Sequence, residues 1–205
     1  MHLDYQDNTL TMIVGPMFSS KTSTLLSYIE RYSYAKKHIG VFSIAKDTRY
    51  SISSITTHTG RTVSSIEVAN AADILEEVEQ DNYDIIFIDE VQFFSNEIVD
   101  VVDTLLKSGK RVIAAGLDTD FAGRGFGPVP ELLARADIVV KLTAVCTVCG
   151  KAATRSQRLV NGKPARLNEE IFLLGAEESY EARCASHHEV PAGGDKKAKL
   201  FKDNK

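Results

Sequence analysis

The stretch from Leu10 to Thr22, LTMIVGPMFSSKT, decides the fold of this chain. An apolar run, Leu10–Val14, leads into a loop, and a helical pattern begins at Lys21. Strand, loop and helix in this order, with Lys-Thr at the junction, are typical of a P-loop. Such a loop wraps backbone N–H groups around nucleotide phosphates at a helix N-terminus. In this pattern Lys21 reaches the β- and γ-phosphates and the Thr22 hydroxyl binds Mg²⁺.

Ser20 stands where the usual P-loop pattern has its second glycine. If the backbone at this position has a positive φ, a serine there costs about 1 kcal/mol, which a nucleotide site tolerates. The alternative interpretation is an ordinary strand–turn–helix unit that happens to carry Ser-Lys-Thr.

The composition is that of a globular protein and argues against some partners. The chain has 205 residues and a formal net charge of -4, whereas a protein that mainly binds nucleic acid needs a basic face. No apolar run is long enough to span a membrane, and the first four residues lack the pattern of a signal peptide. We therefore expect a cytoplasmic protein with no membrane or nucleic-acid partner. Its three cysteines then favour metal binding over disulfides.

Strand-like apolar runs alternate with amphipathic stretches over the first two-thirds of the chain. The predicted strands are Leu10–Val14, Ile39–Ile44, Asp84–Ile88, Arg111–Leu117 and Ile138–Val145. The predicted helices are Lys21–Lys37, Ala71–Glu79, Asn96–Lys107 and Glu131–Ala136. Near-continuous apolar strands separated by helices indicate a mostly parallel sheet covered on both faces, a doubly wound α/β core.

Three regions follow from the changes in pattern along the chain. The α/β core is predicted over residues 1–145, with a hairpin or flap at about 55–65 that lies outside the core sheet. After Cys146, short segments punctuated by Cys, Gly and Pro indicate a small second domain over 146–190. The polar tail, 191–205, is predicted to be disordered.

The run DIIFIDE, Asp84–Glu90, supplies the carboxylates that a phosphate loop needs. Asp89 is placed to bind Mg²⁺ directly or through water. Glu90 follows at the carboxyl end of the strand, where α/β ligand sites lie and where a carboxylate can act as general base. The alternative is a helix N-terminus at which two acidic residues are favoured by the helix dipole.

Weaker candidates follow other predicted strands. Arg49 could stabilise charge on a transferring phosphoryl group or be a surface turn residue. Phe93, Phe94 and Phe121 could stack a flat base or pack in the core. His58, in the predicted hairpin, has no partner that the sequence reveals.

A four-ligand metal site is predicted near the C-terminus. Cys146 and Cys149 form a CxxC pair, and Cys184 and His187 form a second pair at the same spacing. Three thiolates and one imidazole make a closed tetrahedral Zn²⁺ site, which is structural because no position stays open. His188 is the competing fourth ligand, and a redox CxxC with an unpaired Cys184 is the competing interpretation.

The segment between the two pairs, Ser156–Ser179, would form a loop that the metal anchors at both ends. A tethered loop of this kind is suited to act as a lid that excludes water during phosphoryl transfer.

In these motifs the chain resembles the type II (human cytosolic-like) thymidine kinases. The resemblance runs in consistent order over about residues 10–190. The matching segments are GPMFS with Lys21-Thr22, AKDTRY at 45–50, IDEVQFF at 88–94, AGLD at 115–118 with Phe121, KLTAVC at 141–146, and GAEESY at 175–180 with Cys184 and His187.

The resemblance implies a P-loop NTPase-like (RecA-like) fold with a small C-terminal zinc-binding lasso domain. It also implies transfer of the ATP γ-phosphoryl group to the 5′-hydroxyl of thymidine, with Glu90 as general base and with Thr22 and Asp89 on Mg²⁺. The ATP-binding residues would be Gly15, Pro16, Met17, Phe18, Ser19, Ser20, Lys21, Thr22, Arg49, Asp89, Glu90, Val91 and Gln92. The nucleoside-binding residues would be Phe93, Leu117, Phe121, Ile171, Phe172, Leu173, Leu174, Gly175 and Tyr180, and the lasso residues among them would act through their main chain.

Members of this family are commonly homotetramers inhibited by thymidine triphosphate, so the resemblance implies both properties here. The chain departs from the family pattern at Ser20, usually glycine, and at Ala185, usually basic or polar. Two other functions stay open from the residues alone. One is a P-loop ATPase or nucleic-acid-handling protein whose zinc knuckle grips DNA, and the other is a catalytically silent nucleotide sensor.

Overall fold

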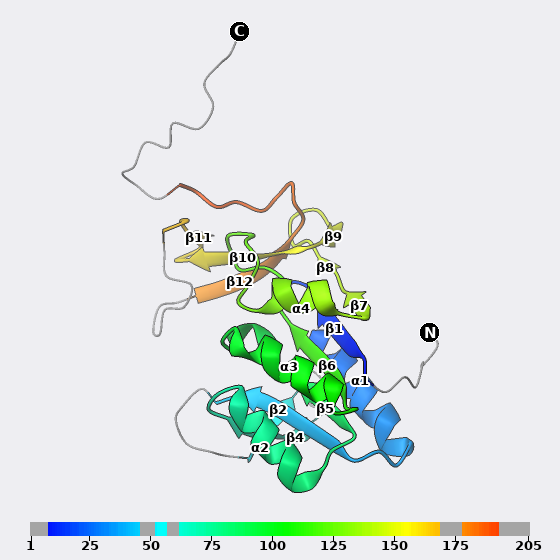
Figure 1. Ribbon diagram of the computed structural model, residues 1–205. Coiled ribbons are helices and arrows are strands. Elements are labelled where there is room, and N and C mark those ends of the chain that lie inside the picture. Colours follow the sequence, from blue (N-terminus) through cyan, green and yellow to red (C-terminus); the bar gives the residue numbers. More distant parts are fainter. Residues whose placement is uncertain (1–7, 46–51, 57–61, 169–177, 193–205) are drawn as a thin grey trace.

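Figure 1 shows the computed structural model of the chain, which describes residues 8–45, 52–56, 62–168 and 178–192. The strands of the main sheet are β1 (Leu10–Val14), β2 (Ile39–Ile44), β3 (Ile52–Thr56), β4 (Thr62–Val68), β5 (Ile85–Ile88), β6 (Arg111–Gly116) and β7 (Ile138–Lys141). Among the described residues they lie in the order β3-β4-β2-β5-β6-β1-β7. All neighbours pair in parallel except β3, which is antiparallel to β4 at one edge.

Helices cover both faces of this sheet, as the alternating pattern predicted. They are α1 (Lys21–Tyr34), α2 (Ala72–Asp81), α3 (Glu97–Lys107), α4 (Val129–Arg135) and a short 3-10 helix, η1 (Val91–Phe93). Successive strand residues point to opposite faces. Ile86 and Ile88 of β5 pack in the core with α2 and α3, whereas Ile85 and Phe87 pack in the core with α1. The doubly wound α/β fold is therefore confirmed.

The helix ends reflect backbone conformation. α1 ends at Tyr34, three residues before the predicted end, and Lys36 beyond it has a left-handed φ of 56°. α3 ends at Lys107, as predicted, and just beyond it Gly109, whose φ is 86°, donates its N–H to the Leu106 carbonyl at 3.0 Å. In the part of the chain that the structure describes, no helix is long and apolar enough to cross a bilayer.

The predicted hairpin is present, but its exclusion from the core sheet is wrong. β3 and β4 pair antiparallel in register from Ile52 opposite Ile66 to Thr56 opposite Thr62. β4 then continues and pairs in parallel with β2, and Val68 is fully buried in the core. Ser64 and Ser65 interrupt the apolar pattern that would otherwise have identified this strand.

The predicted strand Ile138–Val145 is split into two pieces. Its first part is β7, and where β7 ends the Leu142 N–H donates to the Val14 carbonyl at 2.7 Å. Its last two residues form β8 (Ala144–Val145), which pairs antiparallel with β9 (Ala152–Ala153) in a separate ladder.

A second, three-stranded sheet follows, with the order β11-β10-β12. Its strands are β10 (Arg155–Val160), β11 (Lys163–Pro164) and β12 (Glu178–Arg183). Together with β8 and β9 they lie at one end of the molecule, away from α2 and β4 (Figure 1). We call β8–β12, together with residues 184–188 that follow β12, the second lobe. The predicted tethered loop, Ser156–Ser179, thus begins and ends as strand, and residues 169–177 lie outside the described residues.

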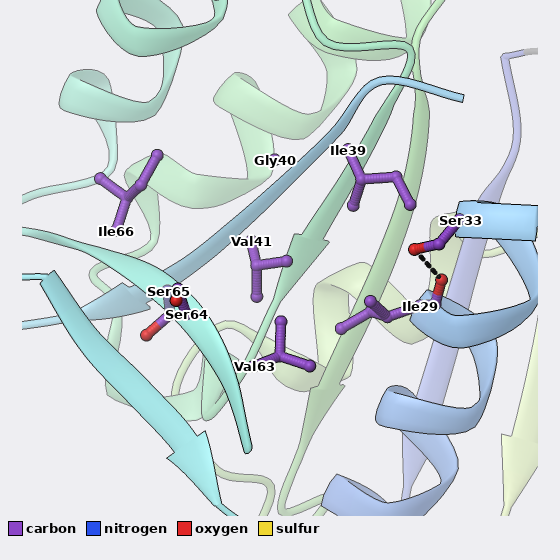
Figure 2. Close-up of a pocket in the computed structure, with 9 residues that line it drawn as sticks. All are labelled: Ile29, Ser33, Ile39, Gly40, Val41, Val63, Ser64, Ser65 and Ile66. Carbon is purple, nitrogen blue, oxygen red and sulfur yellow. Dashed lines mark hydrogen bonds between the residues drawn. The ribbon is translucent and has the colours of Figure 1, made fainter. Parts of the chain in front are cut away.

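A groove of about 400 Å³ lies where the main sheet extends beyond α1 (Figure 2). It is lined by Ile29 and Ser33 of α1, and by Ile39, Gly40, Val41, Val63, Ser64, Ser65 and Ile66. None of the predicted site residues lines this groove.

Candidate functional site

The phosphate loop and the predicted carboxylates lie at the same edge of the main sheet. β1 leads into the loop at 15–20, and β5 ends just before Asp89. Both strands are parallel to β6, which lies between them, so their carboxyl ends meet. Lys21 is close enough to Glu90 and Asp89 for both carboxylates to favour its charged form.

The loop closes on itself through the Pro16 carbonyl. Ser19 Oγ donates to this oxygen at 2.7 Å, and Lys21 Nζ donates to it at 2.8 Å. Gly15 is required by close packing, because a Cβ there would lie 2.5 Å from the Leu142 carbonyl oxygen. Burial lowers the pKa of Lys21, and the charges of Glu90 and Asp89 oppose this shift. The loop is thus preformed, and the Lys21 ammonium group lies against it.

Ser20 adopts the left-handed conformation that the usual glycine would favour. Its φ is 64° and its ψ is 30°, and it precedes α1 without a side-chain capping hydrogen bond. Its carbonyl accepts the Thr24 N–H at 2.9 Å and so begins the helix. A left-handed conformation costs a residue with a Cβ about 1 kcal/mol or more.

Asp89 and Glu90 differ in surroundings. Asp89 is buried, and its Oδ1 accepts the Glu90 N–H at 3.0 Å. Burial, and then the neighbouring Glu90 carboxylate, raise the pKa of Asp89 to about 7. A cation beside Asp89 would favour its charged form. Glu90 is half-buried and has a left-handed φ of 51°, a strained conformation of the kind that clusters at active sites.

The Glu90 side chain is held by its neighbour in η1. Gln92 Nε2 donates to Glu90 Oε2, and Gln92 Oε1 accepts the Leu117 N–H at 3.0 Å. Gln92 and Val91 are both buried. Val91 and Gln92 were predicted to contact ATP, but in this structure both side chains face other protein groups.

The three predicted aromatic residues lie in three different environments. Phe94 is 4% exposed and belongs to the main core, so core packing is the interpretation that the structure supports for it. Phe93 is 40% exposed and meets Phe126 edge-on, with ring centroids 5.7 Å apart. Phe121 is buried where the second lobe meets the core, and the Arg158 guanidinium carbon lies 5.3 Å from its ring centroid.

Three contacts join the second lobe to this edge, and the sequence carries no motif for any of them. Ser156 Oγ accepts the Met17 N–H of the phosphate loop at 3.0 Å. His188 Nε2 donates to the Phe121 carbonyl at 2.8 Å. The third is the Arg158 guanidinium over the Phe121 ring. Arg158 on β10 pairs in register with Tyr180 on β12, a predicted nucleoside contact.

Several predicted site residues lie outside the described residues. They are Arg49, His58 and the lasso residues Ile171, Phe172, Leu173, Leu174 and Gly175. Their roles stay predictions.

The four predicted metal ligands come together in the second lobe, with all ligand atoms within 4.8 Å of one another. Cys149 Sγ lies 3.8 Å from Cys184 Sγ. His187 Nδ1 lies 3.3 Å from Cys184 Sγ and 3.8 Å from Cys146 Sγ. A tetrahedron with Zn–S bonds of about 2.3 Å has S···S edges of about 3.8 Å. The Cys3His cluster is therefore compatible with a structural zinc ion.

The first ligand of this cluster is favoured as a thiolate. Burial disfavours the Cys146 thiolate, but the backbone N–H groups of Cys184, Val148 and Cys149 outweigh it and lower the pKa of Cys146 to about 6. At Cys149 the Lys151 backbone N–H lowers the pKa, but burial and the neighbouring Cys146 and Cys184 thiols outweigh it, so that this pKa is raised. The thiolate is the form that binds metal. All three cysteines are free, and His188 is engaged by Phe121 instead of the cluster.

The chain was compared with models of protein families. A family model described as thymidine kinase matches residues 8–188 of the chain. The match spans the main sheet, the phosphate loop and the four residues of the Cys3His cluster.

Proposed function

Because the chain belongs to the thymidine kinase family, we propose that it transfers the γ-phosphoryl group of ATP to the 5′-hydroxyl of thymidine with Glu90 as the general base. As a member of this family the chain is a thymidine kinase, with thymidine and ATP as substrates. The residue roles are our proposal. One observation supports them most directly: Lys21, Asp89 and Glu90 meet at the carboxyl edge of the sheet.

The donor half of the site is the phosphate loop. Backbone N–H groups of residues 15–20 would surround the phosphates, and Lys21 would leave the Pro16 carbonyl for the β- and γ-phosphates. Thr22 and Asp89 would hold Mg²⁺, which neutralises phosphate charge when bound. The raised pKa of buried Asp89 fits this role, since such a carboxylate gains from a nearby cation. Arg49 would stabilise charge on the transferring group.

Glu90 would act on the acceptor. Its carboxylate takes the proton of the 5′-hydroxyl as that oxygen bonds to the γ-phosphorus. The bond from the γ-phosphorus to the bridging oxygen of ADP breaks in the same displacement. Thymidine monophosphate and ADP are the products.

The nucleoside would lie where the second lobe meets the core. Phe121, Leu117 and Tyr180 would contact the base, together with the exposed ring of Phe93. The main chain of residues 171–175 would complete the pocket. Zinc at the Cys3His cluster would hold the lobe in the shape that these contacts need.

The test is a kinase assay with a panel of nucleosides and Mg·ATP. We expect phosphorylation of thymidine, and loss of the product in a Lys21→Met variant, which controls for a contaminating kinase. ATP hydrolysis that DNA stimulates, with no nucleoside phosphorylated, would support the P-loop ATPase alternative. ATP binding without turnover would support a nucleotide sensor.

Three further properties are proposals. A homotetrameric assembly and feedback inhibition by thymidine triphosphate rest on the family resemblance, and a cytoplasmic location rests on the sequence pattern described above. Sedimentation of the protein would test the assembly, and the kinase assay with added thymidine triphosphate would test the inhibition.

Ser20→Gly should leave catalysis nearly unchanged. The glycine relieves the left-handed strain at φ 64° but has more freedom in the unfolded chain. We expect the free energy of unfolding to rise by about 1 kcal/mol or less, and kcat/KM for ATP to rise modestly or stay the same. Ser23→Gly, at an exposed position inside α1, is the matched control and should destabilise the protein. A large fall in kcat/KM for Ser20→Gly would show that the serine has its own role.

A further inference from the structure

We propose that Gln92 is a positioning residue that holds the Glu90 carboxylate in place for proton abstraction and ties it to the main chain at Leu117. The inference rests on the proposed role of Glu90 as general base. It gives Gln92 a role that acts through Glu90.

The hydrogen bonds of the Gln92 amide fix which end faces Glu90. The Leu117 N–H can only donate, so the amide oxygen must face it, at 3.0 Å. The NH₂ group is thereby directed to Glu90, and Nε2 donates to Glu90 Oε2. A hydrogen bond from an amide donor to a carboxylate is charge-assisted and stronger than one between neutral groups.

Gln92 has little room to adopt another arrangement. It is 2% exposed, and its neighbours Val91 and Phe94 belong to the main core. Leaving a buried amide without hydrogen bonds is unfavourable, so the Gln92 amide needs both of its partners, Glu90 and the Leu117 N–H. The position of the Glu90 carboxylate is thus set from the core of the protein.

Two glycines from other segments leave the space that Gln92 fills. A Cβ at Gly116, the last residue of β6, would lie 2.5 Å from Gln92 Oε1. A Cβ at Gly127, where φ is 51°, would lie 2.4 Å from the Gln92 carbonyl oxygen. Larger residues at either position would push Gln92 away from Glu90.

The charges nearby explain why Glu90 needs such a partner. Of the nearby carboxylates that favour protonated Lys21, Glu90 has the strongest effect. Without the Gln92 donor, the Glu90 carboxylate would be drawn towards the Lys21 ammonium and away from the acceptor hydroxyl. A misplacement of about 1 Å can cost about a hundredfold in rate. The same amide also contacts Leu117, which is proposed to line the nucleoside pocket. One side chain therefore holds both the general base, Glu90, and a residue of this pocket.

The test is a double-mutant cycle between positions 92 and 90. Gln92→Glu keeps an acceptor for Leu117 but places a second carboxylate against Glu90, and Gln92→Leu removes the donor without adding charge. We expect either change to lower kcat about tenfold to a hundredfold, with KM for ATP nearly unchanged. In a Glu90→Gln background, the same changes should have almost no effect on kcat, because the group that Gln92 positions is gone.

Gln157→Glu is the matched control. Gln157 is also fully buried, and its amide bonds to the main chain of Glu189 at 2.9 and 2.8 Å. Any loss of kcat that it causes should be the same in both backgrounds. Thermal unfolding identifies which variants are folded. One folded Gln92 variant is enough for the double-mutant cycle.

The outcomes separate the two proposals. If Glu90→Gln loses activity but the Gln92 changes cost as much in that background as in the wild type, the positioning role is overturned alone. A folded Gln92 variant with wild-type kcat overturns it as well. If Glu90→Gln itself keeps full kcat, the general-base assignment fails, and the inference fails with it.

Discussion

Glu90→Gln is expected to lower kcat by about 10²- to 10⁴-fold, the range that a general base contributes. The amide has nearly the size of the carboxylate and can still accept the hydrogen bond from Gln92 Nε2. It cannot take the proton of the 5′-hydroxyl at neutral pH. Dissociation constants for ATP and thymidine should therefore stay close to those of the wild type. Calorimetric binding and a radiolabelled phosphoryl-transfer assay measure the two quantities separately.

Two further variants give this experiment its controls. Glu97→Gln makes the same change at an exposed position in the first turn of α3 and should keep wild-type kcat. Asp89→Asn should instead raise KM for Mg·ATP, because Asp89 is proposed to hold the metal and not to move a proton. An unchanged kcat in Glu90→Gln would exclude this residue as the base.

The sequence predicts the parts of the fold whose signals are local. β1 and β2 have the predicted bounds to the residue, because each is a short apolar run bounded by polar residues or turns. The place of β4 in the core sheet was not predicted, because Ser64 and Ser65 interrupt its pattern, although the strand lies inside the sheet between β2 and β3. Tertiary pairing there decides the conformation more than local composition does.

In the site, too, the features with local sequence signals can be predicted and the long-range contacts cannot. The P-loop, the Asp89-Glu90 pair and each of the two ligand pairs of the Cys3His cluster can be predicted from residues close together in the sequence. The contacts that join these parts cannot. Met17 bonds to Ser156, 139 residues away, and Phe121 bonds to His188, 67 residues away. Neither contact has a periodic signature, since one hydroxyl or one imidazole can bond to any exposed backbone group.

Because these long-range contacts join the second lobe to the phosphate loop and to Phe121, we expect the lobe to be necessary for activity. Its hydrophobic cluster consists of Ala144, Cys146, Ala153 and Ala182, with Cys184 packed against it. Such small side chains bury little apolar area, so they contribute little free energy of folding. The remaining stability is expected from the Cys3His cluster, because structural zinc contributes about 10–16 kcal/mol in small zinc domains at neutral pH.

Removal of zinc should therefore unfold the second lobe before the core. After chelation, we expect backbone amides of β10 and β12 to lose protection from hydrogen exchange while those of β1, β5 and β6 keep it. Turnover should be lost with the lobe, since the Ser156 contact to Met17 and the Arg158 contact to Phe121 are released together. ATP binding to the phosphate loop should survive, because that loop belongs to the core.

A ligand variant distinguishes the role of the metal from side effects of the chelator. Cys184→Ser removes one thiolate and should reproduce the exchange pattern of the chelated protein, and added zinc should restore the chelated wild type but not this variant. Ala185→Ser, at the exposed neighbouring position, should behave as wild type. If β10 and β12 stay protected in metal-free protein, the lobe folds without zinc. Its attachment to the core through Ser156, Arg158 and His188 would then be sufficient to stabilise it.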